Sequence, residues 1–188
     1  MKHPAPWLVI GGLLQAVAAF SAALISPLGF GGPSPAWWTV FLALMHVPQA
    51  AGLFLLARSA QAGPGLAGRA GFWTAAVAVA VFVPAELVAL VSADATGVIF
   101  AIASPLSGLG LLVAGAATVR RGGRPGIGRF APLITGLYVF VVLMPSLALL
   151  GPVAAVLAIG GWGLCFALLG AATRHRLPAP ARPGTESE

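Results

Sequence analysis

The chain has 188 residues, of which 59% are hydrophobic and only 7% are charged. Soluble domains carry about 25% charged residues because their surface faces water, so this composition excludes a soluble domain and indicates a surface that faces lipid. The net charge of +6 does not indicate nucleic-acid binding, because the basic residues lie in short segments between long apolar runs and not on one soluble face.

Six apolar runs follow one another along the chain, each close to the roughly 20 residues that a helix needs to cross the hydrocarbon core. None alternates polar and apolar residues as the strands of a membrane β-barrel do, and helices satisfy their backbone hydrogen bonds within each segment, as lipid requires. We therefore expect an all-α, polytopic membrane helix bundle of six transmembrane helices, in one domain over residues 1–176. The predicted helices cover residues 7–25, 37–57, 70–92, 97–119, 130–150 and 153–173.

The ten Lys and Arg residues all fall on one side of this arrangement, and the connections after the first, third and fifth runs contain neither residue type. Short basic loops remain in the cytoplasm, so we expect both termini to be cytoplasmic. The excess of Arg over Lys and the abundance of Ala and Gly are typical of a GC-rich bacterial genome, which points to the bacterial inner membrane. The basic residues are Lys2, Arg58, Arg69, Arg120, Arg121, Arg124, Arg129, Arg174, Arg176 and Arg182.

The two ends of the chain carry separate expectations. The first run has the basic start of a signal peptide, but it continues to Ile25, which is longer than a typical signal-peptide core. We expect a retained helix; cleavage would leave five helices in the same orientation. Residues 177–188 are Pro-rich and polar, which predicts a disordered cytoplasmic tail.

The sequence also suggests an internal repeat of three in-out-in hairpins. Segments 64–69 and 125–129 share a Pro-Gly and a Gly-Arg pair. Each leads into a Val-Phe-Val triplet and then to a proline, Pro84 or Pro145. Transporter folds often contain internal repeats. Chance similarity between Ala- and Gly-rich runs explains the same features, so both interpretations stay open.

Three polar side chains lie well inside the apolar runs, His46 and Gln49 in the second and Glu86 in the third. A charged side chain at the bilayer centre costs about 2.5–3.5 kcal/mol on insertion scales, which makes such residues informative. His46 and Gln49 are three residues apart and share one helix face. All three lie in the outer half or near the midplane, so they meet if the second and third helices pack together.

Prolines lie at a similar depth in four successive runs, and serines accompany two of them. Proline removes a backbone donor and frees a carbonyl one turn earlier, and helices interrupted at matching depths indicate a membrane binding site. We expect helix kinks at these prolines. They are Pro48, Pro84, Pro105 and Pro145, and the accompanying serines are Ser104, Ser107 and Ser146.

These features lead to a hypothesis of a small cavity that opens outward. In it, Glu86 is protonated or paired with His46. The competing interpretation gives the same side chains a purely structural role as hydrogen bonds between helices, each worth about 0.6–2 kcal/mol, and it is the favoured one. The proposed ligand-binding residues are His46, Gln49, Glu86, Ser104, Ser107 and Ser146.

Known catalytic patterns are missing from the sequence. It contains no Gly-x-Ser-x-Gly, no His-Glu-x-x-His and no carboxylate pair at metal-binding spacing, which disfavours an enzyme. Cys165 is the only cysteine, which excludes an intramolecular disulfide and a cysteine metal site. We expect neither a metal nor a cofactor.

Two function classes therefore remain. The first is a multi-pass membrane component with a structural or partner-binding role, in contact with lipid and with a second copy or another membrane protein. The alternative is a small carrier or receptor whose cavity around His46 and Glu86 binds a proton, a cation or a small polar ligand. The sequence identifies neither the ligand, the partner nor the oligomeric state.

Overall fold

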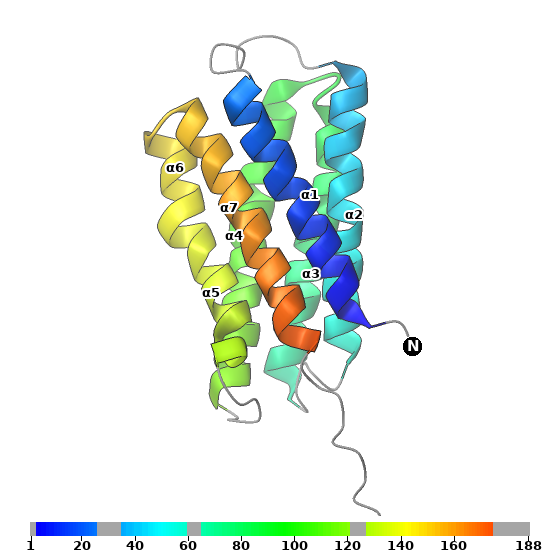
Figure 1. Cartoon of the computed structure of the whole chain (residues 1–188), viewed down its shortest axis with the longest axis vertical. Coiled ribbons are helices and arrows are strands. Elements are labelled where there is room, and N and C mark those ends of the chain that lie inside the picture. The colour runs from blue at the N-terminus through cyan, green and yellow to red at the C-terminus, as the bar shows by residue number, and fades with distance from the viewer. Residues whose placement is uncertain (1–2, 26–34, 60–64, 121–126, 175–188) are drawn as a thin grey trace, which may run out of the picture.

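A computed structural model describes residues 3–25, 35–59, 65–120 and 127–174 of the chain, and these residues are helical apart from short connections. Six helical segments are long and apolar enough to cross a membrane, so the all-α bundle is confirmed (Figure 1) and is compatible with a multi-pass membrane protein. The elements are α1 (Pro4–Ile25), α2 (Ala36–Arg58), α3 (Leu66–Val88), α4 (Ala93–Arg120), α5 (Ala131–Tyr138), α6 (Met144–Leu149) and α7 (Pro152–Arg174).

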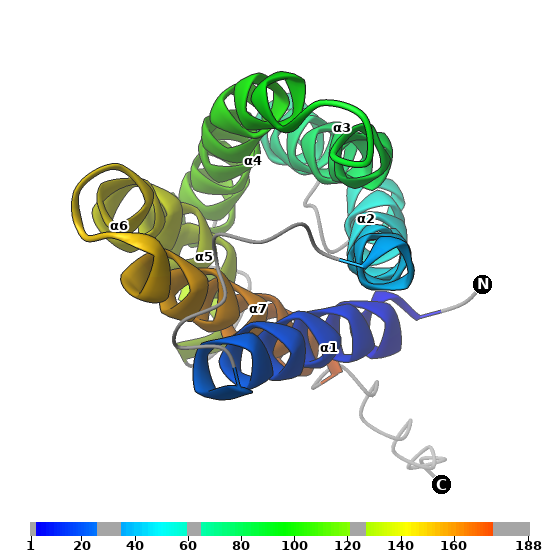
Figure 2. The same ribbon diagram turned by 90° about the horizontal axis from the view of Figure 1, so that it is seen from above.

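The helices form a closed ring in chain order (Figure 2). Each long helix packs against the next, and α7 packs against both α5 and α1, which closes the ring. Short connections between successive helices impose an antiparallel arrangement. Gly151 adopts a φ of +83° in the turn between α6 and α7, a conformation that glycine adopts without steric cost.

The alternating direction of the helices collects the described basic side chains at one end, which we call the basic end. Arg58 and Arg120 close α2 and α4 there, Arg69 lies in the first turn of α3, and Arg129 lies in a 3₁₀ turn before α5. Asp94 lies at the opposite end, in the first turn of α4. Lys2, Arg121, Arg124, Arg176 and Arg182 lie outside the described residues, as does the predicted tail 177–188.

The third and fourth helices each begin four residues earlier in the chain than the sequence predicts. We expected helices over 70–92 and 97–119, whereas α3 spans Leu66–Val88 and α4 begins at Ala93. The reason is Ser92, whose hydroxyl accepts a hydrogen bond from the Ala95 N–H at 3.1 Å. Such a side-chain cap satisfies a free N–H group and starts a helix, so residues 93–96 form the first turn of α4.

The fifth span is not the continuous helix expected over 130–150. It consists of α5, a π-helical turn over Val139–Leu143 and α6. In this turn the Met144 N–H bonds to the Val139 carbonyl, five residues earlier. Pro145 follows directly. A proline ring clashes with the carbonyl four residues before it in a regular α-helix, and a widened turn relieves that clash.

Glycines set the closest approaches between helices. At Gly163 of α7, an added Cβ would lie 2.6 Å from the Gly12 carbonyl oxygen of α1. At Gly71 of α3, it would lie 2.5 Å from the Gly110 carbonyl oxygen of α4. Small residues let helix backbones approach in lipid, where packing replaces the hydrophobic effect as the driving force. These two contacts do not occupy equivalent places in three hairpins, so the internal repeat stays a prediction.

Large side chains fill the centre of the ring in the half near the basic end. Phe72, Leu56, Leu111, Phe166 and Leu169 are all fully buried there. The outward face of the bundle is apolar along its length, as the exposed Val17, Leu44 and Leu168 illustrate. Because this packing closes the centre near the basic end, any central cavity has to lie in the other half.

Candidate functional site

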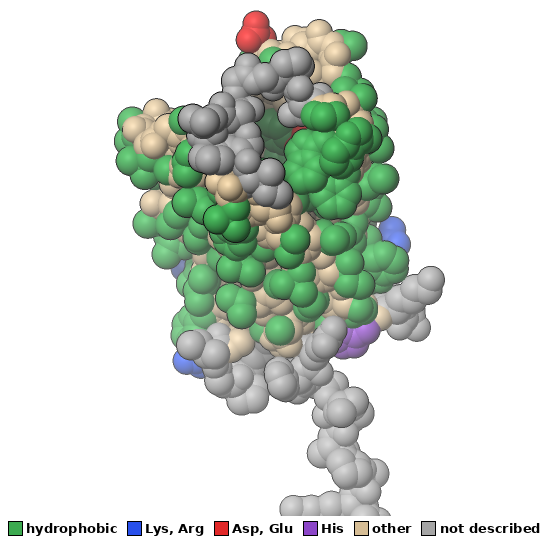
Figure 3. All heavy atoms as spheres, turned by 45° about the horizontal axis from the view of Figure 1, so that its top comes forward, with side chains coloured by type: hydrophobic (Ala, Val, Ile, Leu, Met, Phe, Trp, Pro, Cys, Tyr) green, Lys and Arg blue, Asp and Glu red, His purple; other side chains and the backbone are tan. Residues whose placement is uncertain are grey.

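A cavity of about 230 Å³ lies between the helices in the half away from the basic end. Figure 3 shows that the molecule is hollowed at this end. Every long helix and the π-helical turn contribute to the wall, which is mainly apolar. Its lining residues are Gln15, Ala18, Ala19 and Ala22 of α1; Trp38, Leu42, Met45 and His46 of α2; Phe82 and Glu86 of α3; Phe100 and Ser104 of α4; Leu143 of the π-helical turn; Leu147 of α6; and Val156, Ile159 and Trp162 of α7.

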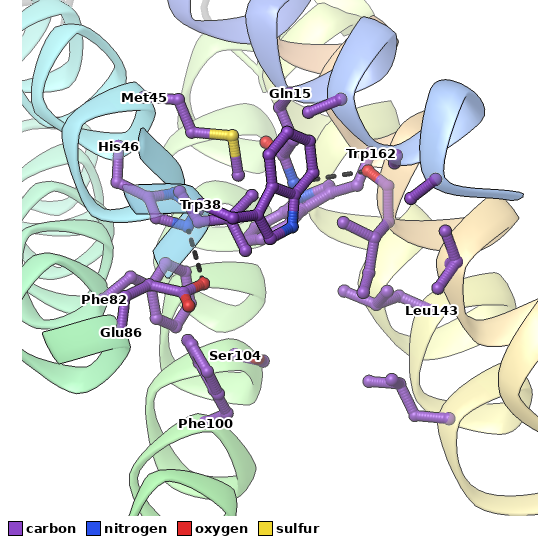
Figure 4. A pocket seen from close by; sticks show the side chains of 17 residues that line it. Gln15, Trp38, Met45, His46, Phe82, Glu86, Phe100, Ser104, Leu143 and Trp162 are labelled. Carbon is purple, nitrogen blue, oxygen red and sulfur yellow. Dashed lines mark hydrogen bonds and ion pairs between the residues drawn. The ribbon is translucent and has the colours of Figure 1, made fainter. Parts of the chain in front are cut away.

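His46 and Glu86 meet at this cavity, as the sequence predicts (Figure 4). His46 Nε2 lies 3.7 Å from Glu86 Oε1. This separation suits an ion pair and exceeds a direct hydrogen bond. The side chain of His46 is 5% exposed and that of Glu86 is 14% exposed. The carboxyl group is therefore the more accessible member of the pair.

A chain of hydrogen bonds runs from His46 across three helices. His46 Nδ1 lies 3.3 Å from Gln49 Oε1. Gln49 Nε2 donates to the Gly11 carbonyl at 3.1 Å and to Gln15 Oε1 at 2.5 Å. Gln15 Nε2 in turn donates to the Ile159 carbonyl of α7 at 3.2 Å. Gln49 is fully buried and Gln15 is nearly so. The chain therefore fixes the polar side chains of α1 and α2 relative to α7.

The direction of these hydrogen bonds defines the histidine tautomer. Both hydrogens of the Gln49 amide go to oxygen acceptors, so the opposite orientation of the amide would place oxygen against oxygen. Gln49 Oε1 therefore faces His46 and acts only as an acceptor. His46 Nδ1 must then carry a hydrogen. The second nitrogen, Nε2, faces Glu86 and is the one available for proton exchange.

Aromatic rings form the inner wall of the cavity around Phe82. Its ring centroid lies 5.2 Å from that of His46, 5.3 Å from that of Phe100 and 5.7 Å from that of Trp162. Trp38 of α2 also lines the cavity and is labelled in Figure 4. Trp162 Nε1 is buried and has no hydrogen-bond partner among the described residues. Aromatic rings carry a negative potential on their faces, and Phe82, Phe100 and Trp162 line the same cavity as the Glu86 carboxyl group.

The structure separates the predicted binding residues into two groups. His46, Glu86 and Ser104 line the cavity. Gln49 lies behind His46, outside the lining, and holds its ring. Ser107 and Ser146 are buried outside the lining, and Ser107 donates to the carbonyl of Ser104 at 2.7 Å. A ligand-binding role for the six residues stays a prediction. Of the six, His46, Glu86 and Ser104 are the ones placed to touch a ligand in the cavity.

The predicted proline positions are all in helices. Pro48, Pro84 and Pro105 lie inside α2, α3 and α4, and their role as kinks stays a prediction. Pro145 lies in the first turn of α6, after the π-helical turn.

Sequence reasoning missed most of the cavity wall. Gln15 donates to the Ile159 carbonyl of α7 and also lines the cavity. Trp38, Phe82, Phe100 and Trp162 gave no signal of a cavity, because an aromatic side chain in an apolar run faces lipid or core equally well. Tyr138 bonds to the Ala158 carbonyl at 3.1 Å, away from the cavity.

The donor set of the site does not suit a metal ion. Among the described residues, no group of three or more His, Cys, Asp or Glu side chains lies close enough to hold one. Comparison of the chain with protein-family models, with curated proteins and with solved structures finds no match.

Proposed function

We propose that this protein is a multi-pass membrane protein that binds a small molecule in its central cavity, as a small carrier or receptor. The observation that carries this proposal is the cavity of about 230 Å³ with the His46–Glu86 pair in its wall. A cavity of roughly 150 Å³ holds benzene, so this site suits a molecule somewhat larger than benzene.

Packing energetics support a binding role over a purely structural one. Helix association in lipid depends on van der Waals contact and interhelical hydrogen bonds. In a soluble core, leaving about 230 Å³ unfilled by side chains forgoes on the order of 5 kcal/mol. Three alanines of α1, Ala18, Ala19 and Ala22, line the site, and larger residues there would fill it. A role in binding a protein partner stays a prediction, because no contact among the described residues supports it.

The proposed orientation places the basic end in the cytoplasm, because short basic connections stay on that side. The cavity lies in the opposite half, so in this orientation it faces the exterior of the cell. The proposed membrane is the inner membrane of a bacterium. A ligand then enters from outside without crossing the packed half around Phe72 and Phe166.

The test uses purified protein in detergent micelles and three probes of equal size. They are phenyltrimethylammonium, its uncharged isostere tert-butylbenzene, and the anion benzenesulfonate. A ligand that binds only the folded state raises the unfolding temperature. We expect at least one probe to do so in the wild type, with the shift lost in Ala19→Phe, which fills the cavity.

Ala101→Phe is the matched control, because Ala101 lies exposed on α4 and outside the lining. It should respond as the wild type does. If Ala19→Phe does not fold, the smaller change Ala22→Leu repeats the test. The proposal is wrong if no probe shifts the wild type, or if the cavity-filling variants respond as strongly as Ala101→Phe.

A further inference from the structure

We infer that the cavity takes a small hydrophobic organic cation, in exchange for the proton that His46 and Glu86 hold between them. This inference rests on the proposed function and specifies its ligand. It follows from the charges, the ring faces and the hydrogen-bond directions around the cavity, taken together.

Among the described residues, His46 of α2 and Glu86 of α3 are the only titratable side chains that line the cavity. The lining from α1 offers only Gln15 and alanines, that from α4 only Ser104 and Phe100, and that from α6, α7 and the π-helical turn offers no titratable group. Within the described residues, a ligand therefore meets one acidic and one basic group, and nothing else that can change charge.

Gln49 Oε1 can only accept a hydrogen bond, so His46 Nδ1 carries a hydrogen. With one further proton, the pair is neutral overall, either as imidazolium with carboxylate or as imidazole with carboxylic acid. A monovalent cation beside this neutral pair would leave a net charge of +1 in a low-dielectric site, which is unfavourable. Release of the shared proton leaves a carboxylate, a neutral imidazole and the cation, and charge balances again.

Phe82, Phe100, Trp38 and Trp162 line the same cavity as the Glu86 carboxyl group. Aromatic faces attract cations, and quaternary ammonium groups are commonly bound by several rings around one charge. The wall is apolar elsewhere, so it also favours the hydrocarbon part of the ligand.

Hard divalent cations fit this site poorly. A hard divalent cation such as Ca²⁺ takes six to eight oxygen ligands. The described lining supplies one carboxyl group, the Ser104 hydroxyl and the Gln15 amide, whose oxygen already accepts from Gln49. Too few oxygens remain for an ion stripped of water, whereas an organic cation carries its own apolar shell.

The experiment measures binding of phenyltrimethylammonium by calorimetry in micelles. Its charge is permanent, so any proton released comes from the protein. Comparing buffers with different heats of ionisation gives the number of protons released, and we expect close to one per bound cation. Because a proton leaves the protein for the solvent when the cation binds, raising the pH should tighten binding.

Glu86→Gln removes the carboxylate and keeps the shape, and we expect at least a roughly tenfold loss of cation affinity. Asp94→Asn is the matched control, since Asp94 is the other described acidic residue and lies outside the cavity. Trp38→Leu should also weaken cation binding several-fold, whereas Trp37→Leu should not, because Trp37 is exposed and does not line the cavity.

The outcomes separate the two proposals. Equal binding of tert-butylbenzene and phenyltrimethylammonium would retain the cavity as a binding site and overturn the cation assignment, as would preferred binding of benzenesulfonate. Cation binding without proton release would overturn the exchange. Binding of none of the three would overturn the proposed function itself. If Glu86→Gln does not fold, proton release and probe selectivity in the wild type still decide the matter.

Discussion

Gln49 Nε2 lies 2.5 Å from Gln15 Oε1, and this contact joins α2 to α1 beside the cavity. Gln49 is the branching point of the hydrogen-bond chain, since it also bonds to His46 and to the Gly11 carbonyl. Gln15 has one further partner, the Ile159 carbonyl. The two glutamines therefore differ in how many polar groups depend on them.

Replacing Gln49 should destabilise the bundle more than replacing Gln15. Gln49→Leu leaves His46 Nδ1, Gln15 Oε1 and the Gly11 carbonyl without this partner, and we expect a loss of about 2 kcal/mol in the free energy of unfolding. Gln15→Leu leaves one donor hydrogen of Gln49 without its acceptor and removes the side-chain donor to the Ile159 carbonyl, and should cost about 1 kcal/mol. Unfolding by denaturing detergent in mixed micelles measures both.

The double variant completes this comparison. Because the two side chains bond to each other, its loss should be smaller than the sum of the two single losses. Additive losses, or a larger loss for Gln15→Leu, would contradict the hydrogen-bond chain as described.

The tautomer of His46 provides a second prediction. Gln49 Oε1 accepts from Nδ1, so the neutral ring should carry its hydrogen on Nδ1, which is the less common form in water. Nitrogen NMR chemical shifts of His46 distinguish the two ring nitrogens. Gln49→Leu should abolish the preference. A wild-type ring protonated only on Nε2 would show that the Gln49 amide is oriented the other way.

Close glycine contacts lead to a third prediction. An added methyl group at Gly163 would lie 2.6 Å from the Gly12 carbonyl oxygen and 2.8 Å from the Ala16 nitrogen. Both are backbone atoms, so α1 and α7 would have to separate. Gly163→Ala should therefore cost about 1–3 kcal/mol of stability, as overpacking usually does, measured by the same unfolding assay.

Gly97 supplies the matched control for this substitution. It also lies in a helix, α4, but an added Cβ would meet no heavy atom within 4 Å. Gly97→Ala should leave stability unchanged or raise it slightly, because alanine favours a helix over glycine. Equal losses for the two alanine variants would attribute the effect to helix propensity and not to packing of α1 on α7.

Much of the fold could be predicted because lipid imposes few solutions on a long apolar run. The helix limits agree with the apolar runs to within four residues. Differences of four residues occur at both ends of α3 and at the start of α4, and the last of these comes from the Ser92 cap. The sequence predicted a kink at Pro145, and it did not predict that a π-helical turn would precede this proline. Composition cannot distinguish a proline kink from a π-helical turn such as the one over Val139–Leu143.

The polar residues of the candidate site could be predicted because polar side chains are unusual in apolar runs. The apolar residues of its wall could not be predicted. His46 and Glu86 stand out in apolar runs, and their spacing from the helix ends placed them at one depth. Ser107 looked equivalent to Ser104, yet it points its hydroxyl at the carbonyl of its own helix. Phe82 and Phe100 give no such signal, because only three-dimensional packing decides whether an aromatic ring faces the cavity, the core or lipid.

Orientation in the membrane gives the last prediction, and the first residue of α3 and the turn after α3 offer a matched pair of positions for it. Leu66 lies at the basic end and is 89% exposed, and Val91 lies at the opposite end and is 86% exposed. Cys165 is the only cysteine, so Cys165→Ala provides a background without thiols. Leu66→Cys and Val91→Cys, made singly in that background, leave every charge of the chain in place. Because basic connections stay in the cytoplasm, a membrane-impermeant maleimide should label the Val91→Cys protein in intact cells. It should label the Leu66→Cys protein only after the cells are permeabilised. The reverse pattern would put the basic end outside and turn the cavity toward the cytoplasm, and labelling of both in intact cells would contradict a helix that crosses the membrane between them.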